Sequence, residues 1–165
     1  MLTIPDPGFA GDDGSASPTL AAVLAGYASD QSSYVDVLAV LQGERLLVPV
    51  VALLGEVEYD EQGLAHDKTS DMATVLIQGR DGRLALLAFS STDALHRWNP
   101  EARPVPASLE RVAAAAVQDQ ASAIVIDVAG PTSFVLEQDD VAALAEGFTL
   151  VELASGVAWA KEGQR

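Results

Sequence analysis

The sequence contains no cysteine, so neither disulfide bonds nor thiolate metal sites can form. It is also poor in basic residues: 9 Lys and Arg stand against 24 Asp and Glu, for a formal net charge of −15. Nucleic acids and anionic membrane surfaces bind clustered Lys and Arg, so this charge excludes both as partners. Acidity favours solubility, and the lack of cysteine fits a reducing compartment. We therefore expect a soluble cytoplasmic protein.

Long apolar segments are missing as well. The longest apolar run, residues 46–54, has nine residues and contains Pro49, so it is too short to span a membrane. No basic region followed by an apolar run opens the chain, and we expect no signal peptide. A hydrophobic fraction of 49% supplies a core, and 165 residues is an ordinary size for one domain. The composition along the chain predicts a flexible arm over residues 1–16, a single domain over 17–160 and a frayed tail over 161–165.

Apolar spacing predicts the secondary structure. Helical spacing follows the cap signal Ser17–Pro18 and recurs over residues 34–41, 92–98, 109–117 and 141–145. Strand-like runs cover residues 45–54, 73–78, 83–89, 123–127 and 132–137, with a loosely alternating tail over 148–159. Asp81 and Gly82 supply the turn of an antiparallel hairpin between two of these runs. The fold class expected is α/β (α+β): a mixed sheet that contains an antiparallel hairpin, with helices packed on it.

Sequence motifs of catalysis and cofactor binding are absent. The chain has no GxxxxGK[ST] or GxGxxG phosphate loop, no GxSxG nucleophile elbow and no HExxH pair, and His66 and His96 lie far apart in sequence. The acidic residues at 56, 58, 60 and 61 are interpreted as a solvated face rather than as a metal site. We expect no cofactor and no metal, and the absences favour a noncatalytic protein without deciding the question.

The first candidate site is the polar segment Lys68, Thr69, Ser70 and Asp71, which lies directly before a predicted strand. Loops held by rigid elements often carry binding residues. The alternative interpretation is a turn in which the hydroxyl and carboxylate groups bond their own backbone.

The second candidate site combines Trp98 and Arg103 on either side of a Pro-containing turn. An indole beside a guanidinium can form a stacking site, and both residue types dominate interface hot spots. The alternative is that Trp98 fills the end of the core while Arg103 pairs with a nearby carboxylate.

Three segments carry a family resemblance. The stretch DKTSDMATVLIQGRDGRLALLAFSSTDALHRWNPEARPVP (67–106), with LLVPVVAL (46–53) before it and AIVIDVAGPTSFVL (123–136) after it, resembles the SseB-type N-terminal domain. The resemblance implies a small bacterial cytosolic domain, sometimes followed by a second domain. The family is named for an enhanced serine sensitivity phenotype and has no agreed catalytic residues. The positions that fit its pattern best are Lys68, Thr69, Ser70, Asp71, Trp98, Arg103 and Pro104.

Two functions of different classes follow from these residues. The first is a noncatalytic interaction module, in which a groove near residues 68–71 and 98–103 takes up a segment of a protein partner. The second is a small-molecule site for an amino acid or another metabolite, with or without chemistry: Lys68 and Arg103 would hold a carboxylate and Asp71 an amine. An open patch would favour the protein partner, and an enclosed pocket would favour the small molecule.

Overall fold

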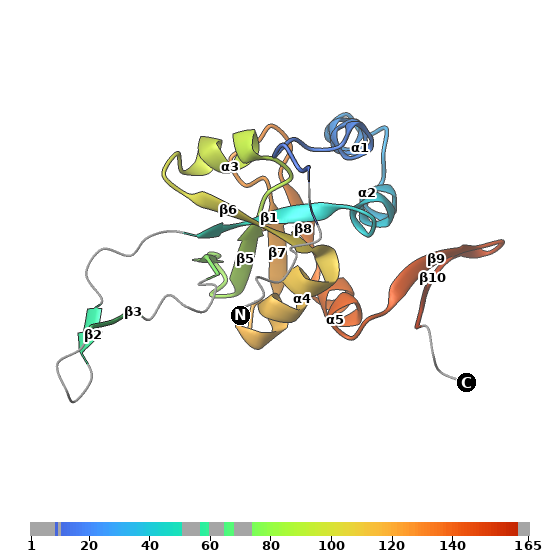
Figure 1. Ribbon diagram of the computed structural model, residues 1–165. Coiled ribbons are helices and arrows are strands. Elements are labelled where there is room, and N and C mark those ends of the chain that lie inside the picture. The colour runs from blue at the N-terminus through green and yellow to red at the C-terminus, as the bar shows by residue number, and fades with distance from the viewer. Residues whose placement is uncertain (1–8, 10, 51–56, 60–64, 68–73, 162–165) are drawn as a thin grey trace.

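The computed structural model describes residue 9 and residues 11–50, 57–59, 65–67 and 74–161 (Figure 1). The helices of this part of the chain are α1 (Pro18–Ala28), α2 (Tyr34–Leu41), α3 (Thr92–Trp98), α4 (Leu109–Gln118) and α5 (Gln138–Ala145). The strands are β1 (Arg45–Val50), β2 (Val57–Tyr59), β3 (Ala65–Asp67), β4 (Leu76–Gln78), β5 (Leu84–Ala88), β6 (Arg103–Ser108), β7 (Ala123–Ile126), β8 (Phe134–Leu136), β9 (Thr149–Leu153) and β10 (Gly156–Ala160).

Serine side chains set the starts of four helices. The hydroxyl oxygens of Ser17, Ser33, Ser91 and Ser108 each accept a hydrogen bond from a backbone N–H in the first turn of α1, α2, α3 and α4. Each bond satisfies one of the N–H groups that a helix start leaves without a partner. The predicted cap at Ser17, followed by a proline in the first turn of α1, is confirmed.

A four-stranded sheet in the order β4-β5-β7-β8 forms the centre of the fold. β5 and β7 are parallel, whereas β4 and β8 pair antiparallel with β5 and β7. The turn between β4 and β5 is the predicted hairpin, in which Gly82 adopts a positive φ of 82°. The mixed sheet with an antiparallel hairpin and packed helices confirms the expected α+β class.

Helices cover one face of this sheet and form the main core with it. β5, β7 and β8 contribute Leu86, Ala88, Ile124, Ile126, Phe134 and Leu136, all fully buried. Leu20 of α1, Leu38 of α2, Val112 of α4 and Val141 of α5 belong to the same cluster. Figure 1 shows α4 and α5 lying against the central strands, with α1 and α2 grouped nearby. Burial of these side chains is the main source of stability of the fold.

A second, smaller layer lies beside the central sheet. β1 pairs antiparallel with β6, and the backbone groups of Leu47 and Phe89 exchange two hydrogen bonds of 2.8 Å that join β1 to the end of β5. Pro49 lies opposite Pro104 in this pair, so the two residues without an N–H face each other. The predicted strand over 45–54 is confirmed for residues 45–50, and residues 51–54 lie outside the described part of the chain.

Three local expectations are corrected by the structure. The loosely alternating tail, interpreted as a single last strand, forms a hairpin of two strands, β9 and β10. Val117, the last residue of the apolar spacing predicted over 109–117, does not lie in the core but is 50% exposed. Asp127 was placed in a strand, yet β7 ends at Ile126 and Asp127 has a positive φ of 56°.

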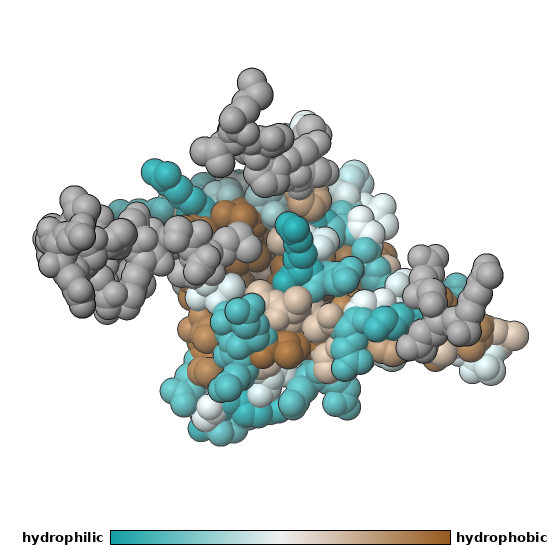
Figure 2. Space-filling view, turned by 60° about the horizontal axis from the view of Figure 1, so that its bottom comes forward, coloured by the Kyte–Doolittle hydropathy of each residue, from teal (hydrophilic) through white to brown (hydrophobic). Residues whose placement is uncertain are grey.

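On the face shown in Figure 2, hydrophobic residues lie in separate patches among hydrophilic ones.

Candidate functional site

The central sheet has a second face that is apolar and only partly buried: Leu87 of β5 is fully buried there with Leu47 of β1 and Leu95 of α3, whereas the residues around it are more exposed. Side chains alternate between the two faces of a strand, so the neighbours of the core residues point to the opposite side. The strand register aligns Ile77 with Ala85 and Ala85 with Ala123 in one row, and Val125 with Val135 in the next. We call these five residues the open face. Four of them are half-buried and Val135 is 41% exposed.

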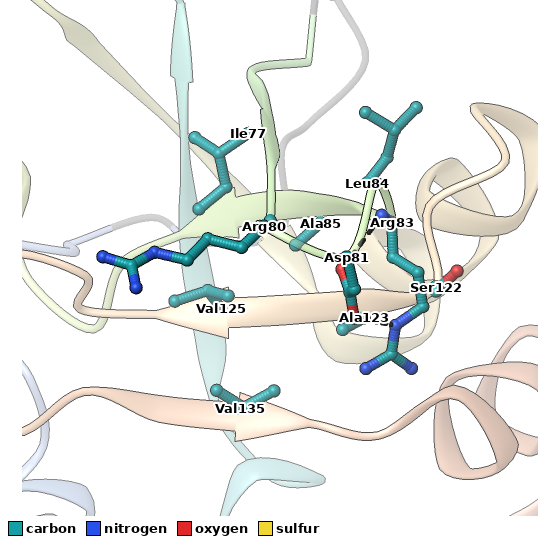
Figure 3. A pocket seen from close by; sticks show the side chains of 11 residues that line it. Ile77, Arg80, Asp81, Arg83, Leu84, Ala85, Ser122, Ala123, Val125 and Val135 are labelled. Atoms are coloured by element: carbon teal, nitrogen blue, oxygen red, sulfur yellow. Dashed lines mark hydrogen bonds and ion pairs between the residues drawn. The ribbon is translucent and has the colours of Figure 1, made fainter.

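Two arginines from the β4–β5 hairpin flank the open face. Together they line a pocket of about 400 Å³ whose floor is the apolar strand surface. Figure 3 shows Arg80 extending over β7 near Val125, and Arg83 near Ser122 and Ala123. Arg83 forms an exposed ion pair with Asp81 at 2.7 Å, and this bond lowers the pKa of the Asp81 carboxyl. The hairpin turn that the sequence predicted therefore places two guanidinium groups beside an apolar surface.

The site combines an apolar floor with charged groups at its edge. Its floor carries aliphatic side chains, and its charged groups are two guanidiniums and the carboxylate of Asp81. A solvent-facing sheet surface normally carries polar residues, whereas this one carries Ile, Ala and Val. In the described residues, no three His, Asp or Glu side chains gather where they could hold a metal ion.

Of the predicted site residues, Trp98 lies on the same buried cluster as two residues of the open face. Its indole packs against the Phe89 ring, with ring centroids 5.7 Å apart. Ile77, Val125 and Trp98 all pack against the same buried cluster of Leu47, Leu87, Phe89, Ala94, Leu95 and Ala102. Trp98 thus fills the edge of a core, as the alternative interpretation held, and it does so on the same side of the sheet as the open face.

The other predicted residues are not assembled into one site by the described structure. Arg103 is exposed at the start of β6, opposite Val50. The segment Lys68, Thr69, Ser70 and Asp71 lies outside the described residues. The convergence of Lys68, Asp71 and Arg103 on one ligand stays a prediction.

Sequence reasoning missed Arg80, Arg83, Val125 and Val135 as binding residues. A signal for the arginines was present, because they flank the Asp-Gly pair of the predicted hairpin. The strand periodicity also placed Val125 and Val135 in strands. Which face of a sheet stays uncovered depends on where the helices pack, and that is a tertiary property.

The fold and the open face define a small α+β domain whose central sheet is covered by α1, α2, α4 and α5 on one side and is only partly covered on the other, where an apolar surface lines a pocket. The family model for the SseB protein N-terminal domain matches residues 20–143, which is more than half of the chain. The protein belongs to this family, as the resemblance implied. All residues of the open face, with Arg80, Arg83 and Trp98, lie inside the matched region.

Comparison with curated proteins and with solved structures gave no match. Among the described residues, no helix has both the length and the apolar character needed to cross a membrane.

Proposed function

We propose that this domain is a noncatalytic protein-interaction module that binds its partner through the open face. The observation that supports this proposal is the group of aliphatic side chains on the part of this sheet face that the described helices leave uncovered. Exposed apolar surface of this kind costs free energy in water, and in soluble proteins it marks sites of association.

The charges beside the open face restrict the chemistry of the partner. The chain carries a net charge of −15, yet two of its nine basic residues, Arg80 and Arg83, line this pocket. A partner segment that places apolar side chains on Val125 and Val135 would bring its own carboxylates to these guanidiniums. We therefore infer a partner segment that combines aliphatic or aromatic residues with Asp or Glu.

The residues singled out in the sequence extend this proposal. Trp98 would enlarge the apolar contact, because it packs on the same cluster as Ile77 and Val125. We retain Arg103 and the segment 68–71 as further candidate contacts. The cysteine-free sequence and the family resemblance support placing this interaction in the bacterial cytoplasm.

Affinity capture with matched variants tests the proposal. The tagged protein and its variants are incubated with the cytosol of the native cell, and bound proteins are quantified by mass spectrometry. Val135→Glu places a charge on the apolar floor, and Arg80→Glu/Arg83→Glu reverses the flanking charge. Each is expected to reduce capture of the true partner by about tenfold or more, since tenfold corresponds to about 1.4 kcal/mol of binding free energy.

The control variants make the same chemical changes on α4. Val117 is 50% exposed and Arg111 is also exposed, so Val117→Glu matches Val135→Glu, and Arg111→Glu reverses one exposed charge where the double variant reverses two. Both are expected to retain the partner. A set of captured proteins that is identical for all variants would disprove the proposal, provided that thermal unfolding shows every variant to be folded.

A further inference from the structure

A second cavity lies at the other end of the central sheet, where the parallel strands β5 and β7 end. It has a volume of about 310 Å³. Its polar lining comes from Ser90, Ser91, Asp93, Arg97, Asp127 and Thr132, and α1 contributes Ala21, Leu24 and Ala25. Figure 1 shows the turn after β7 at the top of the view, between α3 and α1. Crevices outside the carboxyl ends of parallel strands are the usual ligand sites of α/β sheets.

Asp127 is the buried charged group of this cavity. It is 2% exposed, and its two carboxylate oxygens accept hydrogen bonds from Ser90, one from the backbone N–H at 2.8 Å and one from the hydroxyl at 2.6 Å. A carboxylate offers about four lone-pair positions, so these two bonds leave acceptor capacity on a group that lines a cavity. Burial raises the pKa of the Asp127 carboxyl, and the two hydrogen bonds from Ser90 oppose this shift.

A purely structural role would not require a carboxylate here. An asparagine at position 127 could accept from the Ser90 N–H and donate to the Ser90 hydroxyl without the cost of burying a charge. The ion pairs formed within the described residues join Arg45 to Asp12 and Arg83 to Asp81, and neither involves Asp127. Arg97 lines the same cavity but is exposed and forms no ion pair with Asp127, so a cationic ligand would supply a countercharge in contact with this carboxylate.

We propose that the cavity between α1, α3 and the turn after β7 binds a small molecule that carries a protonated primary amine, with Asp127 as its anchor. The ammonium group would sit against the Asp127 carboxylate, and Ser91 and Thr132 line the same cavity with hydroxyl groups. The apolar body of the ligand would contact Ala21, Leu24 and Ala25. This site is separate from the open face, which lies at the hairpin end of the sheet.

Binding of small amines to the whole protein tests this inference. The probes are ethylamine, isobutylamine, ethanolamine and putrescine, each paired with the alcohol that replaces the amine by a hydroxyl. Titrations at near-physiological salt are followed by amide chemical shifts in ¹H–¹⁵N NMR spectra. We expect at least one amine to shift the amides of Ser90, Ser91, Asp127 and Thr132, while its paired alcohol does not.

Asp127→Asn is the test variant, because it removes the charge while its amide can still accept from the Ser90 N–H and donate to the Ser90 hydroxyl oxygen. It is expected to weaken amine binding by about tenfold or more, as expected for the loss of one member of a buried charge pair. Asp139→Asn removes the same charge from an exposed position on α5 and is expected to bind as the original protein does.

Three results would overturn the inference. They are no shift with any amine, equal shifts with the alcohols, or equal affinity in Asp127→Asn. If that variant does not fold, the map of shifted amides in the original protein decides, since shifts away from the cavity would contradict the proposed site. Val135→Glu should leave amine binding unchanged. The amine-site proposal and the interaction-surface proposal can therefore fail independently of each other.

Discussion

Phe134→Ala is expected to lower the free energy of unfolding by about 3–5 kcal/mol, the usual cost of removing a buried phenylalanine. Phe134 is fully buried on β8, where it meets two aromatic rings. Tyr27 of α1 approaches its edge with ring centroids 5.1 Å apart, and Tyr34 of α2 stacks on it at 5.2 Å. Truncation would leave a cavity at the point where the first two helices contact the sheet. Urea unfolding followed by circular dichroism measures the loss.

The neighbouring residue on β8 provides the control. Val135 points to the opposite face and is 41% exposed, so Val135→Thr keeps the β-branched shape while changing little buried volume. We expect this variant to stay within about 0.5 kcal/mol of the original protein, as is usual for surface positions. A similar loss for both variants would contradict the assignment of one core face and one open face to the sheet.

Arg45→Ala is expected to cost about 2–3 kcal/mol, because it leaves several acceptors without a partner. The Arg45 side chain is 10% exposed. Its guanidinium bonds both carboxylate oxygens of Asp12, at 2.6 and 3.0 Å, and donates to the backbone carbonyls of Ser15 and Ser90 at 2.6 Å. The Arg45 side chain therefore links residues 12–15 to β1 and to the segment that follows β5.

The form of the guanidinium matters as much as its charge. Arg45→Lys should recover less than half of the loss, because a lysine ammonium cannot reproduce the planar fork. Arg111→Ala, at an exposed position, is expected to change stability by less than about 0.5 kcal/mol. If Arg45→Lys restored the full free energy of unfolding measured in urea, charge alone would account for the stabilisation by Arg45, which would contradict this prediction.

The pair with Asp12 also has a defined pH dependence. The hydrogen bond from Arg45 lowers the pKa of the Asp12 carboxyl below its ordinary value of 3.8. The stability from ionised Asp12 is therefore present above about pH 4 and is lost as the pH falls through the lowered pKa. The stability difference between the original protein and Arg45→Ala should shrink in that acidic range.

Local signals in the sequence were sufficient for most of the secondary structure. Ser17 with Pro18, the Asp81–Gly82 turn and the Asn99–Pro100 stop are chemical features of single residues, and each marks an element boundary as expected. The two-stranded tail was not anticipated, because loose alternation over residues 148–159 does not show where one strand ends and the next begins. The division into arm, domain and tail stays a prediction.

The candidate sites were harder to predict because they depend on contacts between distant residues. Asp127 follows an apolar strand, and nothing local shows that its carboxylate would bond Ser90, 37 positions earlier in the chain. The open face likewise depends on the register that puts Val125 beside Val135. Trp98 was recognised from its residue type, and the structure then placed it on the same cluster as Ile77 and Val125.

The most direct test of the central claim is photocrosslinking in the native cell. A benzophenone amino acid at position 135 samples the open face, and the same amino acid at position 117 samples α4 at comparable exposure. We predict a discrete crosslinked partner from position 135 that disappears when Arg80 and Arg83 are changed to Glu, and no such product from position 117. Absence of a product at 135, or the same product from both positions, would contradict the claim that the open face is the interaction surface.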